Sequence, residues 1–409
     1  MALTVTLTEG PAQGSPQASE QRGATGGPRR SVGSTLPDFP WDSLAPAKAR
    51  AAAHPGGLVD LSVGTPVDPT PAVVTAALAG AADAPGYPQT WGTAPLREAV
   101  AAWFARRRGV PGLDPDGVLP TIGSKELVAW LPLLLGLGAG DVVAHPSIAY
   151  PTYDVGARLA GAAPLRADTV EELEAAWAAG RRIRLLWLNS PSNPTGSVLE
   201  VAELAALVAW ARAHDVVVAS DECYAELGWD TGHDAAAGGL VPSVLDPRVC
   251  GGDRTGLLSV YSTSKQSNLA GYRAAFVAGD VALVRELLEV RKHAGMIVPW
   301  PVQVALTAAV SDDAHVDAQR ERYRARREVL RPALEAAGFR VDASVAGLYL
   351  WCTRGAPSRA TVDLLADRGV LVAPGDFYGP PGAQHVRIAL TGTDERIGRV
   401  PGRLADLVP

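Results

Sequence analysis

Short runs of apolar residues alternate with longer amphipathic segments over much of the chain. The apolar runs predict buried strands at residues 118–122, 141–144, 182–188, 216–219, 257–261 and 274–278. Apolar positions at helical spacing predict helices between them, at residues 95–105, 124–135, 153–159 and 201–213. Buried strands that alternate with helices are typical of a mostly parallel sheet covered on both faces. The pattern therefore predicts an α/β fold.

The pattern changes after Pro301. A long charged helix is expected at residues 314–337. Short strands are expected after it, at residues 339–341, 348–351 and 386–390. This order of elements predicts a second, smaller α+β domain.

The chain is therefore expected to have three regions. Residues 67–298 should form the large domain, and residues 36–66 and 299–409 the small one. Residues 1–35 are rich in Gly, Ser and Pro and hold few large apolar side chains. We expect this N-terminal extension to be disordered, because it has too little apolar surface to bury.

Composition and charge narrow the choice of partners. The 409 residues carry a net charge of −6 and a pI near 5.7, which argues against nucleic acid or an anionic membrane as the main partner. The 3 cysteines and 7 histidines show no metal-ligand spacing and no disulfide framework, so we expect no metal and a reducing compartment, the cytoplasm. The longest apolar run, near residues 127–137, is broken by Pro132 and Gly136 and is too short to cross a bilayer.

The segment from Ser262 to Arg273 carries the most specific candidate chemistry. Lys265 lies among small hydroxylated residues, and Arg273 follows eight positions later. A lysine amine that is partly deprotonated can form an imine with an aldehyde cofactor, and a guanidinium can hold a phosphate. Pyridoxal 5'-phosphate (PLP) is the cofactor that needs both groups. Lys125 also follows a predicted strand, but it lacks a downstream Gly-Tyr-Arg sequence, so Lys265 is preferred.

Further polar residues follow the predicted strands, where ligands bind in open α/β sheets. Ser124 begins a helix, and the backbone there could hold a phosphate or simply be capped by the serine. The segment 189–196 could be a turn-rich connection with no chemical role. Asp221, with Tyr224 three positions later, could cap a helix or keep a pyridine nitrogen protonated. Each of these signals is open when it is taken alone.

Taken in chain order, these groups resemble the motifs of fold-type-I PLP-dependent aminotransferases of the aspartate-aminotransferase kind. The matching groups, within residues 36–407, are Gly64-Thr65-Pro66, Tyr87, Gly92, Leu96-Arg97, Asn193-Pro194-Thr195-Gly196, Asp221, Tyr224, Ser262, Lys265, Arg273 and Arg387. The resemblance implies a mostly parallel sheet of the seven-stranded type in the large domain, beside a small α+β domain. It also implies an enzyme that acts on amino acids and 2-oxo acids as a homodimer.

The resemblance implies roles around the cofactor ring. Lys265 would carry the covalent link to the cofactor, and Asp221 would pair with its pyridine nitrogen. Asn193 and Tyr224 would hydrogen-bond the phenolate oxygen of the ring, and Tyr150 would stack on the ring. Lys265, Asp221 and Tyr224 are thus the expected catalytic residues.

The same resemblance implies a phosphate site and a substrate clamp. The phosphate would be held by Ser124, the backbone of Lys125, Ser262 and Arg273. Tyr87 would reach it from a neighbouring subunit, so that the two active sites of a dimer are shared. Arg387 would bind the α-carboxylate of the substrate with two hydrogen bonds, beside Gly64 and Asn193.

Five segments look more specifically like the succinyldiaminopimelate aminotransferases: residues 36–42, 59–69, 123–130, 291–296 and 385–391. That family transfers an amino group from glutamate to N-succinyl-2-amino-6-oxopimelate, in the synthesis of lysine and cell-wall precursors. Because this acceptor carries several carboxylates, a second cation besides Arg387 is expected. Arg291 and Lys292 are candidates, although they could equally lie on a solvated helix face.

Several other functions are compatible with parts of the sequence. Another class I aminotransferase, for aspartate or a different amino acid, or a C–S lyase would keep every cofactor residue and differ only in the substrate pocket. Ser262 and Lys265 also fit the Ser-x-x-Lys motif of serine acyl-enzymes, but the Ser-Asp-Asn and Lys-Thr-Gly motifs of that class do not follow. A transcription regulator would need a DNA-reading helical module, for which residues 1–35 are too short and too polar. Three aromatic residues could either shape the pocket or pack in the core: Trp41, Trp91 and Tyr153.

Overall fold

The computed structural model describes residues 31–230 and 232–407. Contacts within the chain define two units, of which the first is residues 1–35. In that unit η1 (Val32–Thr35) is a short 3-10 helix. The disorder expected for the N-terminal extension concerns mainly residues 1–30, which lie outside the described residues.

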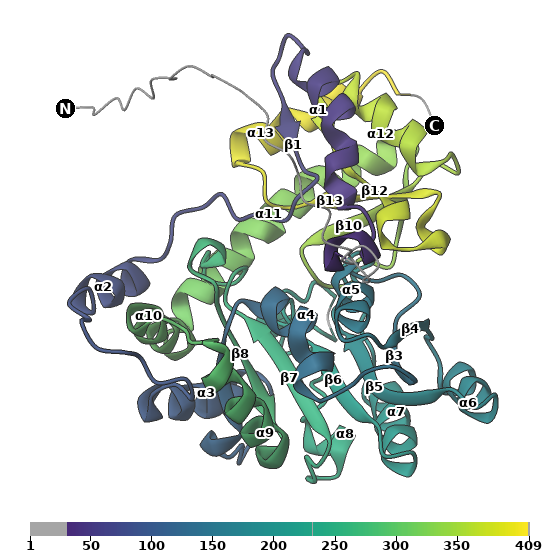
Figure 1. The fold of residues 1–409 in the computed structure, drawn as a ribbon. Coiled ribbons are helices and arrows are strands. Elements are labelled where there is room, and N and C mark those ends of the chain that lie inside the picture. The colour runs from purple at the N-terminus through teal and green to yellow at the C-terminus, as the bar shows by residue number, and fades with distance from the viewer. Residues whose placement is uncertain (1–30, 231, 408–409) are drawn as a thin grey trace, which may run out of the picture. The chain divides into compact units, whose positions relative to one another are not determined.

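The second unit contains a seven-stranded sheet with the strand order β2-β8-β7-β6-β5-β3-β4 (Figure 1). Its strands are β2 (Val118–Ile122), β3 (Asp141–His145), β4 (Ala163–Arg166), β5 (Arg182–Asn189), β6 (Val217–Asp221), β7 (Leu257–Ser262) and β8 (Ala274–Gly279). Within this sheet only β8 runs against the others, because it pairs antiparallel with both β2 and β7. The predicted α/β fold with a mostly parallel sheet is confirmed.

Helices cover both faces of this sheet, because successive strand side chains point to opposite sides. Along β7, Leu257 and Tyr261 belong to one core, and Leu258 and Val260 to the other. The core of Leu258 is completed by α4 (Ser124–Leu134), α5 (Thr152–Leu159) and α9 (Val281–Ala294). The core of Leu257 is completed by α2 (Ala72–Gly80), α3 (Ala94–Arg107), α6 (Val170–Ala178), α7 (Val201–Ala213), α8 (Pro247–Cys250) and α10 (Trp300–Ser311).

The C-terminal part forms an antiparallel four-stranded sheet with the order β12-β13-β10-β9. Its strands are β9 (Arg340–Asp342), β10 (Tyr349–Thr353), β12 (Ala373–Pro374) and β13 (His385–Ala389). The helices of this part are α1 (Ala45–Ala52), α11 (Ala314–Ala336), α12 (Ser358–Ala366), α13 (Asp394–Gly398) and α14 (Val400–Leu404).

An early segment of the chain packs with this C-terminal part. β1 (Val59–Asp60) pairs in parallel with β11 (Val370–Leu371), and Figure 1 shows α1 beside α12. Leu44 and Leu61 lie in the same apolar core as residues of β10 and β13. α10, in contrast, packs on the seven-stranded sheet although it follows residue 299. The division of the chain into a large and a small domain at the stated boundaries stays a prediction.

Short 3-10 helices lie in the remaining connections: η2 (Pro40–Leu44), η3 (Pro115–Gly117), η4 (Ala235–Ala237), η5 (Ala270–Tyr272), η6 (Gly375–Tyr378) and η7 (Pro380–Gly382). In the part of the chain that the structure describes, no helix has the length and apolar character needed to cross a membrane.

Candidate active site

The polar residues that follow the parallel strands gather at one edge of the seven-stranded sheet. β2, β5, β6 and β7 present their carboxyl ends to this edge, beside a cavity of about 690 Å³. Eleven of the twelve site residues predicted from the sequence line this cavity: Gly64, Ser124, Lys125, Tyr150, Asn193, Asp221, Tyr224, Ser262, Lys265, Arg273 and Arg387. The twelfth, Tyr87, is fully exposed and does not line it. The predicted residues therefore form one site, with a single exception.

Lys265 follows β7 and lines the cavity. Its ammonium group donates a hydrogen bond to the carbonyl oxygen of Gly64. Burial lowers the pKa of the Lys265 amine, and the positive charge of Arg387 acts in the same direction. A larger fraction of this amine is therefore neutral near pH 7 than of an exposed lysine, and the neutral form is the nucleophile and the base.

The start of α4 and Arg273 form a candidate anion site. Gly123 is the N-cap of α4, and no side chain caps the helix, so its first N–H groups are available to a ligand. Gly123 has a φ of 75°, and a Cβ atom there would collide with the guanidinium of Arg273. Ser262 Oγ lies 2.8 Å from Ser264 Oγ beside this group. Helix N–H groups, hydroxyls and a guanidinium together suit a phosphate.

Asp221 ends β6 and is almost fully buried. Its Oδ2 accepts a hydrogen bond of 2.9 Å from the Tyr153 hydroxyl, and its Oδ1 accepts one of 3.2 Å from the Cys223 N–H. Burial raises the pKa of the Asp221 carboxyl, against the effect of these hydrogen bonds. A buried carboxylate of this kind gains most from a cationic partner, such as a protonated pyridine nitrogen.

Arg387 lies on β13 and is 2% exposed. Its Nη1 donates to Asn193 Oδ1 at 2.8 Å, and its Nη2 donates to the Ser62 carbonyl at 2.7 Å. Its Nε has no hydrogen-bond partner, and no carboxylate among the described residues pairs with it. A buried guanidinium without a counter-charge is well suited to bind a carboxylate that enters the cavity.

Two tyrosines complete the site in ways that the sequence does not reveal. Tyr153, which could equally have been a packing residue, bonds Asp221 directly. Tyr349 on β10 lies with its hydroxyl 3.1 Å from that of Tyr224, and its ring centroid lies 3.9 Å from Cζ of Arg387. The sequence offers one signal for Tyr153, namely its position. It lies three residues after Tyr150, in the first turn of α5.

The candidates for a second substrate-binding cation lie elsewhere. Arg291 is fully buried and pairs with Glu126 at 2.8 Å, and Lys292 is exposed and pairs with Glu289 at 2.7 Å. Neither lines the cavity. Of the aromatic candidates, Trp41 and Tyr153 line the cavity, whereas Trp91 packs against the guanidinium of Arg97.

Comparisons with known proteins identify the family. Residues 57–404 match the family model described as aminotransferase class I and II. The chain belongs to this family. Its members use PLP, and the uncapped start of α4, Arg273 and Asp221 fit that cofactor's phosphate and pyridine nitrogen. The described residues contain no group of three or more side chains that could hold a metal ion.

This aminotransferase has close relatives of known sequence and structure. It is 59% identical to a "probable aminotransferase" of Mycobacterium tuberculosis, over 97% of this chain and 93% of the relative. It is 58% identical to 4-dedimethylamino-4-oxo-anhydrotetracycline transaminase of Streptomyces rimosus, over 90% of this chain and 99% of that protein. A solved structure from Thermus thermophilus, described as a probable N-succinyldiaminopimelate aminotransferase, is similar with a TM-score of 0.78 and 30% identity, over 90% of this chain and all of that one.

Proposed function

We propose that this PLP-dependent aminotransferase transfers an amino group between glutamate and N-succinyl-2-amino-6-oxopimelate. The observation that carries the proposal is the buried Arg387, which has no carboxylate partner and lines the same cavity as Lys265. A pocket of that kind favours a substrate with an α-carboxylate next to its amino group. The choice of substrate is supported by the five segments that resemble succinyldiaminopimelate aminotransferases and by the similar Thermus thermophilus structure.

The residues of the cavity divide the work between them. When bound, PLP supplies an aldehyde that captures amino groups and a ring that stabilises negative charge. Arg387 binds the α-carboxylate of the substrate, beside Gly64 and Asn193. Lys265 Nζ takes the proton from the substrate Cα as a general base. Asp221 holds a proton on the pyridine nitrogen, because its buried carboxylate favours a cation there.

The other residues hold the cofactor in place. Asn193 and Tyr224 hydrogen-bond the ring oxygen, and Tyr150 stacks on the ring. Burial raises the pKa of the Tyr224 phenol, so it stays protonated and can donate. The phosphate is bound by Ser124, the backbone of Lys125, Ser262 and Arg273. The two half-reactions give ping-pong kinetics.

A second candidate function is amination of the 4-oxo group of an anhydrotetracycline. The relative from Streptomyces rimosus is named for that reaction, and its 58% identity exceeds the 30% of the Thermus thermophilus structure. The residues that bind PLP serve both reactions equally. The two candidates therefore differ only in what the walls around Arg387 and Tyr150 accept.

A half-reaction screen separates the candidates. PLP-loaded enzyme is mixed with single amino acids, and the absorbance of the bound cofactor is followed as it changes to the amine form. We expect conversion by glutamate and by N-succinyl-diaminopimelate, because both offer an α-carboxylate to Arg387. Conversion by a 4-amino-anhydrotetracycline, without conversion by N-succinyl-diaminopimelate, would support the second candidate. Failure of both with conversion by another amino acid would reject the substrates but not the family.

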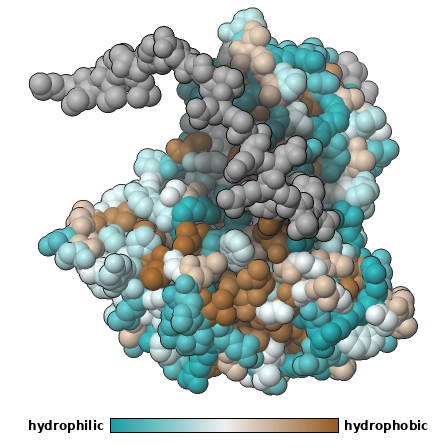
Figure 2. Space-filling view, in the orientation of Figure 1, coloured by the Kyte–Doolittle hydropathy of each residue, from teal (hydrophilic) through white to brown (hydrophobic). Residues whose placement is uncertain are grey.

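We also infer that two copies form a dimer that shares its active sites. Tyr87 is fully exposed, so it is free to reach a neighbouring subunit. α4 and α9 expose Trp130, Leu133 and Val290, and Figure 2 shows hydrophobic surface over this part of the molecule. Exposed apolar patches of this kind mark contacts between proteins.

Mixed dimers test whether Tyr87 acts across the interface. Tyr87→Ala should lower cofactor affinity about tenfold, because a hydrogen bond to a charged phosphate is lost. A dimer of one Tyr87→Ala chain and one Lys265→Ala chain should bind the cofactor with wild-type affinity at its one active site, since that site takes Lys265 from the first chain and Tyr87 from the second. A dimer in which each chain carries both substitutions is the control, because neither of its sites contains Lys265 or Tyr87. If the active site of the mixed dimer keeps the tenfold weaker affinity of Tyr87→Ala, or if sedimentation gives the mass of one 42.5 kDa chain, the shared site is rejected.

A further inference from the structure

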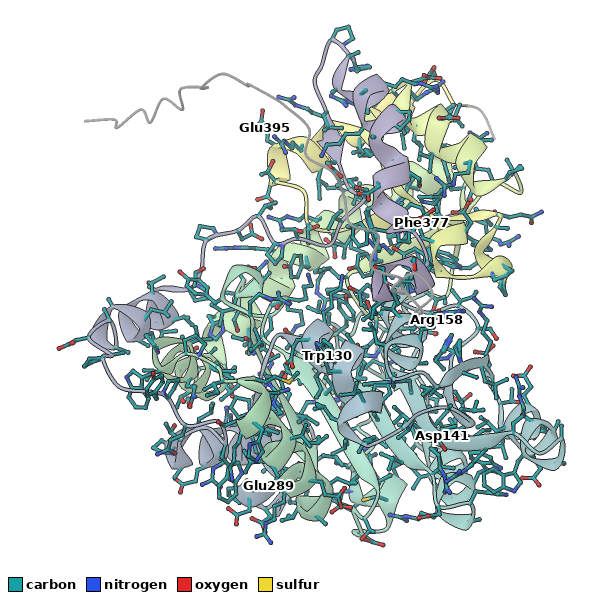
Figure 3. All side chains as sticks on the ribbon, in the orientation of Figure 1. Trp130, Asp141, Arg158, Glu289, Phe377 and Glu395 are labelled. Carbon is teal, nitrogen blue, oxygen red and sulfur yellow. The ribbon has the colours of Figure 1, made fainter. Side chains whose placement is uncertain are left out.

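A second cavity, of about 740 Å³, adjoins the first. Phe39, Trp41, Lys125 and Tyr150 line both cavities, so the two are continuous across these side chains. Figure 3 labels two residues that line the second cavity, Arg158 on α5 and Phe377 of η6. In this view Phe377 lies above Arg158. No part of the mechanism described above uses this second space.

The walls of the second cavity are mostly apolar. They come from the segment before η2, from α4 and α5, and from η6: Leu36, Pro37, Phe39, Ala129, Val155 and Phe377. A cavity of this size and character is typical of sites for small organic ligands, which bury most of their surface. Because it opens from the first cavity, its natural occupant is the part of the substrate that lies beyond the reacting carbon.

Two cations that line the second cavity, Arg166 and Lys125, have no counter-charge among the described residues. Arg166 ends β4 and is exposed, and its guanidinium makes no hydrogen bond or ion pair with any described residue. Arg158, by contrast, pairs with Asp154, and the cavity's Asp376 pairs with Arg359.

Asp38 is the one carboxylate of the cavity lining without a partner among the described residues. Lys125, at the junction with the first cavity, adds a second unpaired cation. The unpaired charge of the cavity is therefore positive.

The same cavity contains buried polar atoms without partners. His145 pairs with Arg166 across β3 and β4, so both side chains lie on one face of the sheet. His145 Nδ1 lies 2.9 Å from the Pro146 carbonyl, which can only accept, so Nδ1 carries the hydrogen. Burial lowers the pKa of His145, which leaves a neutral ring with an acceptor at Nε2. Three buried polar atoms have no hydrogen-bond partner among the described residues: His145 Nε2, Trp41 Nε1 and the Tyr378 hydroxyl oxygen. Unsatisfied buried groups of this kind favour a polar ligand.

We propose that the second cavity is the subsite for the distal part of the substrate, and that Arg166 binds an anionic group at its far end. The proposal rests on the proposed function, since Arg387 must hold the α-carboxylate while the chain of the substrate passes Tyr150 and Trp41. Arg166 is then a specificity residue for long anionic substrates. A substrate that ends near Arg387 does not reach it.

The test uses unreactive carboxylates, so it does not require the natural substrate. Calorimetric titration of the PLP-loaded enzyme compares each dicarboxylate with the monocarboxylate of equal chain length, from glutarate to sebacate. Chain length alone adds apolar contact to both members of a pair, so the difference isolates the second carboxylate. We expect sebacate to bind about tenfold more tightly than decanoate, while glutarate gains nothing from Arg166. Arg166→Ala should reduce that advantage to less than about twofold.

Two further variants separate charge from space. Arg181→Ala removes the same charge from an exposed arginine outside both cavities, and it should leave the preference for sebacate intact. Val155→Trp should fill the second cavity and exclude sebacate and decanoate alike, while glutarate still binds. Equal affinity of sebacate and decanoate for the wild-type enzyme would overturn the proposal, and so would a preference that survives Arg166→Ala. If the half-reaction screen rejects N-succinyl-diaminopimelate but Arg166→Ala abolishes the preference, the substrate named above fails and the subsite stands.

Discussion

Replacing Lys265 with alanine is expected to reduce kcat by about 10⁴-fold or more with any amino donor. In the proposed mechanism the side chain has two roles, as the covalent anchor of the cofactor and as the base that moves the substrate Cα proton. Burial lowers the pKa of its amine, which favours both roles near neutral pH. Among the described residues, the only other lysine that lines the cavity is Lys125, whose amine lies over the rings of Phe39 and Tyr150. The measurement is the rate of the half-reaction with glutamate.

The chain offers a sharp control for this prediction. It contains 4 lysines, Lys48, Lys125, Lys265 and Lys292, so borohydride reduction of the loaded enzyme followed by peptide mapping has few possible outcomes. We expect the label on Lys265 alone. Lys292→Ala removes an exposed side chain that pairs with Glu289, and it should leave kcat unchanged. An unchanged circular dichroism spectrum would show that Lys265→Ala is folded. A label on another lysine, or a Lys265→Ala enzyme that still turns over, contradicts the assignment.

The strands that the sequence predicts are those with continuous apolar side chains. β7 and β8 are buried along their whole length, and both are expected from their composition. β4 is not expected, because none of its four residues is buried and it includes Pro164. An edge strand needs only one neighbour, so its sequence carries little of the apolar signal on which the prediction depends.

The site residues fall into two groups. Some can be found from their order along the chain, and others only from the contacts of the folded protein. Lys265 and Asp221 each follow a buried strand, and parallel strands bring such positions to one edge. Tyr349 enters the site from another sheet, and the distance to Arg387 follows from the pairing of β10 with β13. Arg166 lies beside His145 at the second cavity only because β4 pairs in register with β3. Register between strands distant in sequence is not encoded in local spacing, so these residues stay hidden until the fold is known.

Replacing Asp221 with asparagine is expected to lower kcat by about 10²–10³-fold and to stabilise the cofactor-free protein. The loss of rate arises because a neutral amide does not keep a proton on the pyridine nitrogen. The gain in stability arises because the variant lacks a buried carboxylate. In the folded wild-type protein, burial raises the pKa of Asp221 above its unfolded value of about 3.9. The folded state then binds the proton more tightly than the unfolded chain does. The wild-type protein therefore loses stability as the pH rises through the folded pKa, and the asparagine variant does not.

The stability difference is measured as the Tm of the two cofactor-free proteins at several pH values. It should be largest near pH 8 and should disappear below about pH 3, where Asp221 is protonated in both states. Asparagine keeps the local contacts, since its oxygen can accept from the Cys223 N–H and its amide can donate to the Tyr153 hydroxyl. Asp215→Asn changes a fully exposed carboxylate with a φ of 54°, a conformation that asparagine also adopts, and should alter neither kcat nor the pH profile of Tm. If Asp221→Asn lowers Tm at pH 8, the carboxylate stabilises the empty site and the argument from burial fails. If kcat is unchanged, Asp221 is not the partner of the pyridine nitrogen.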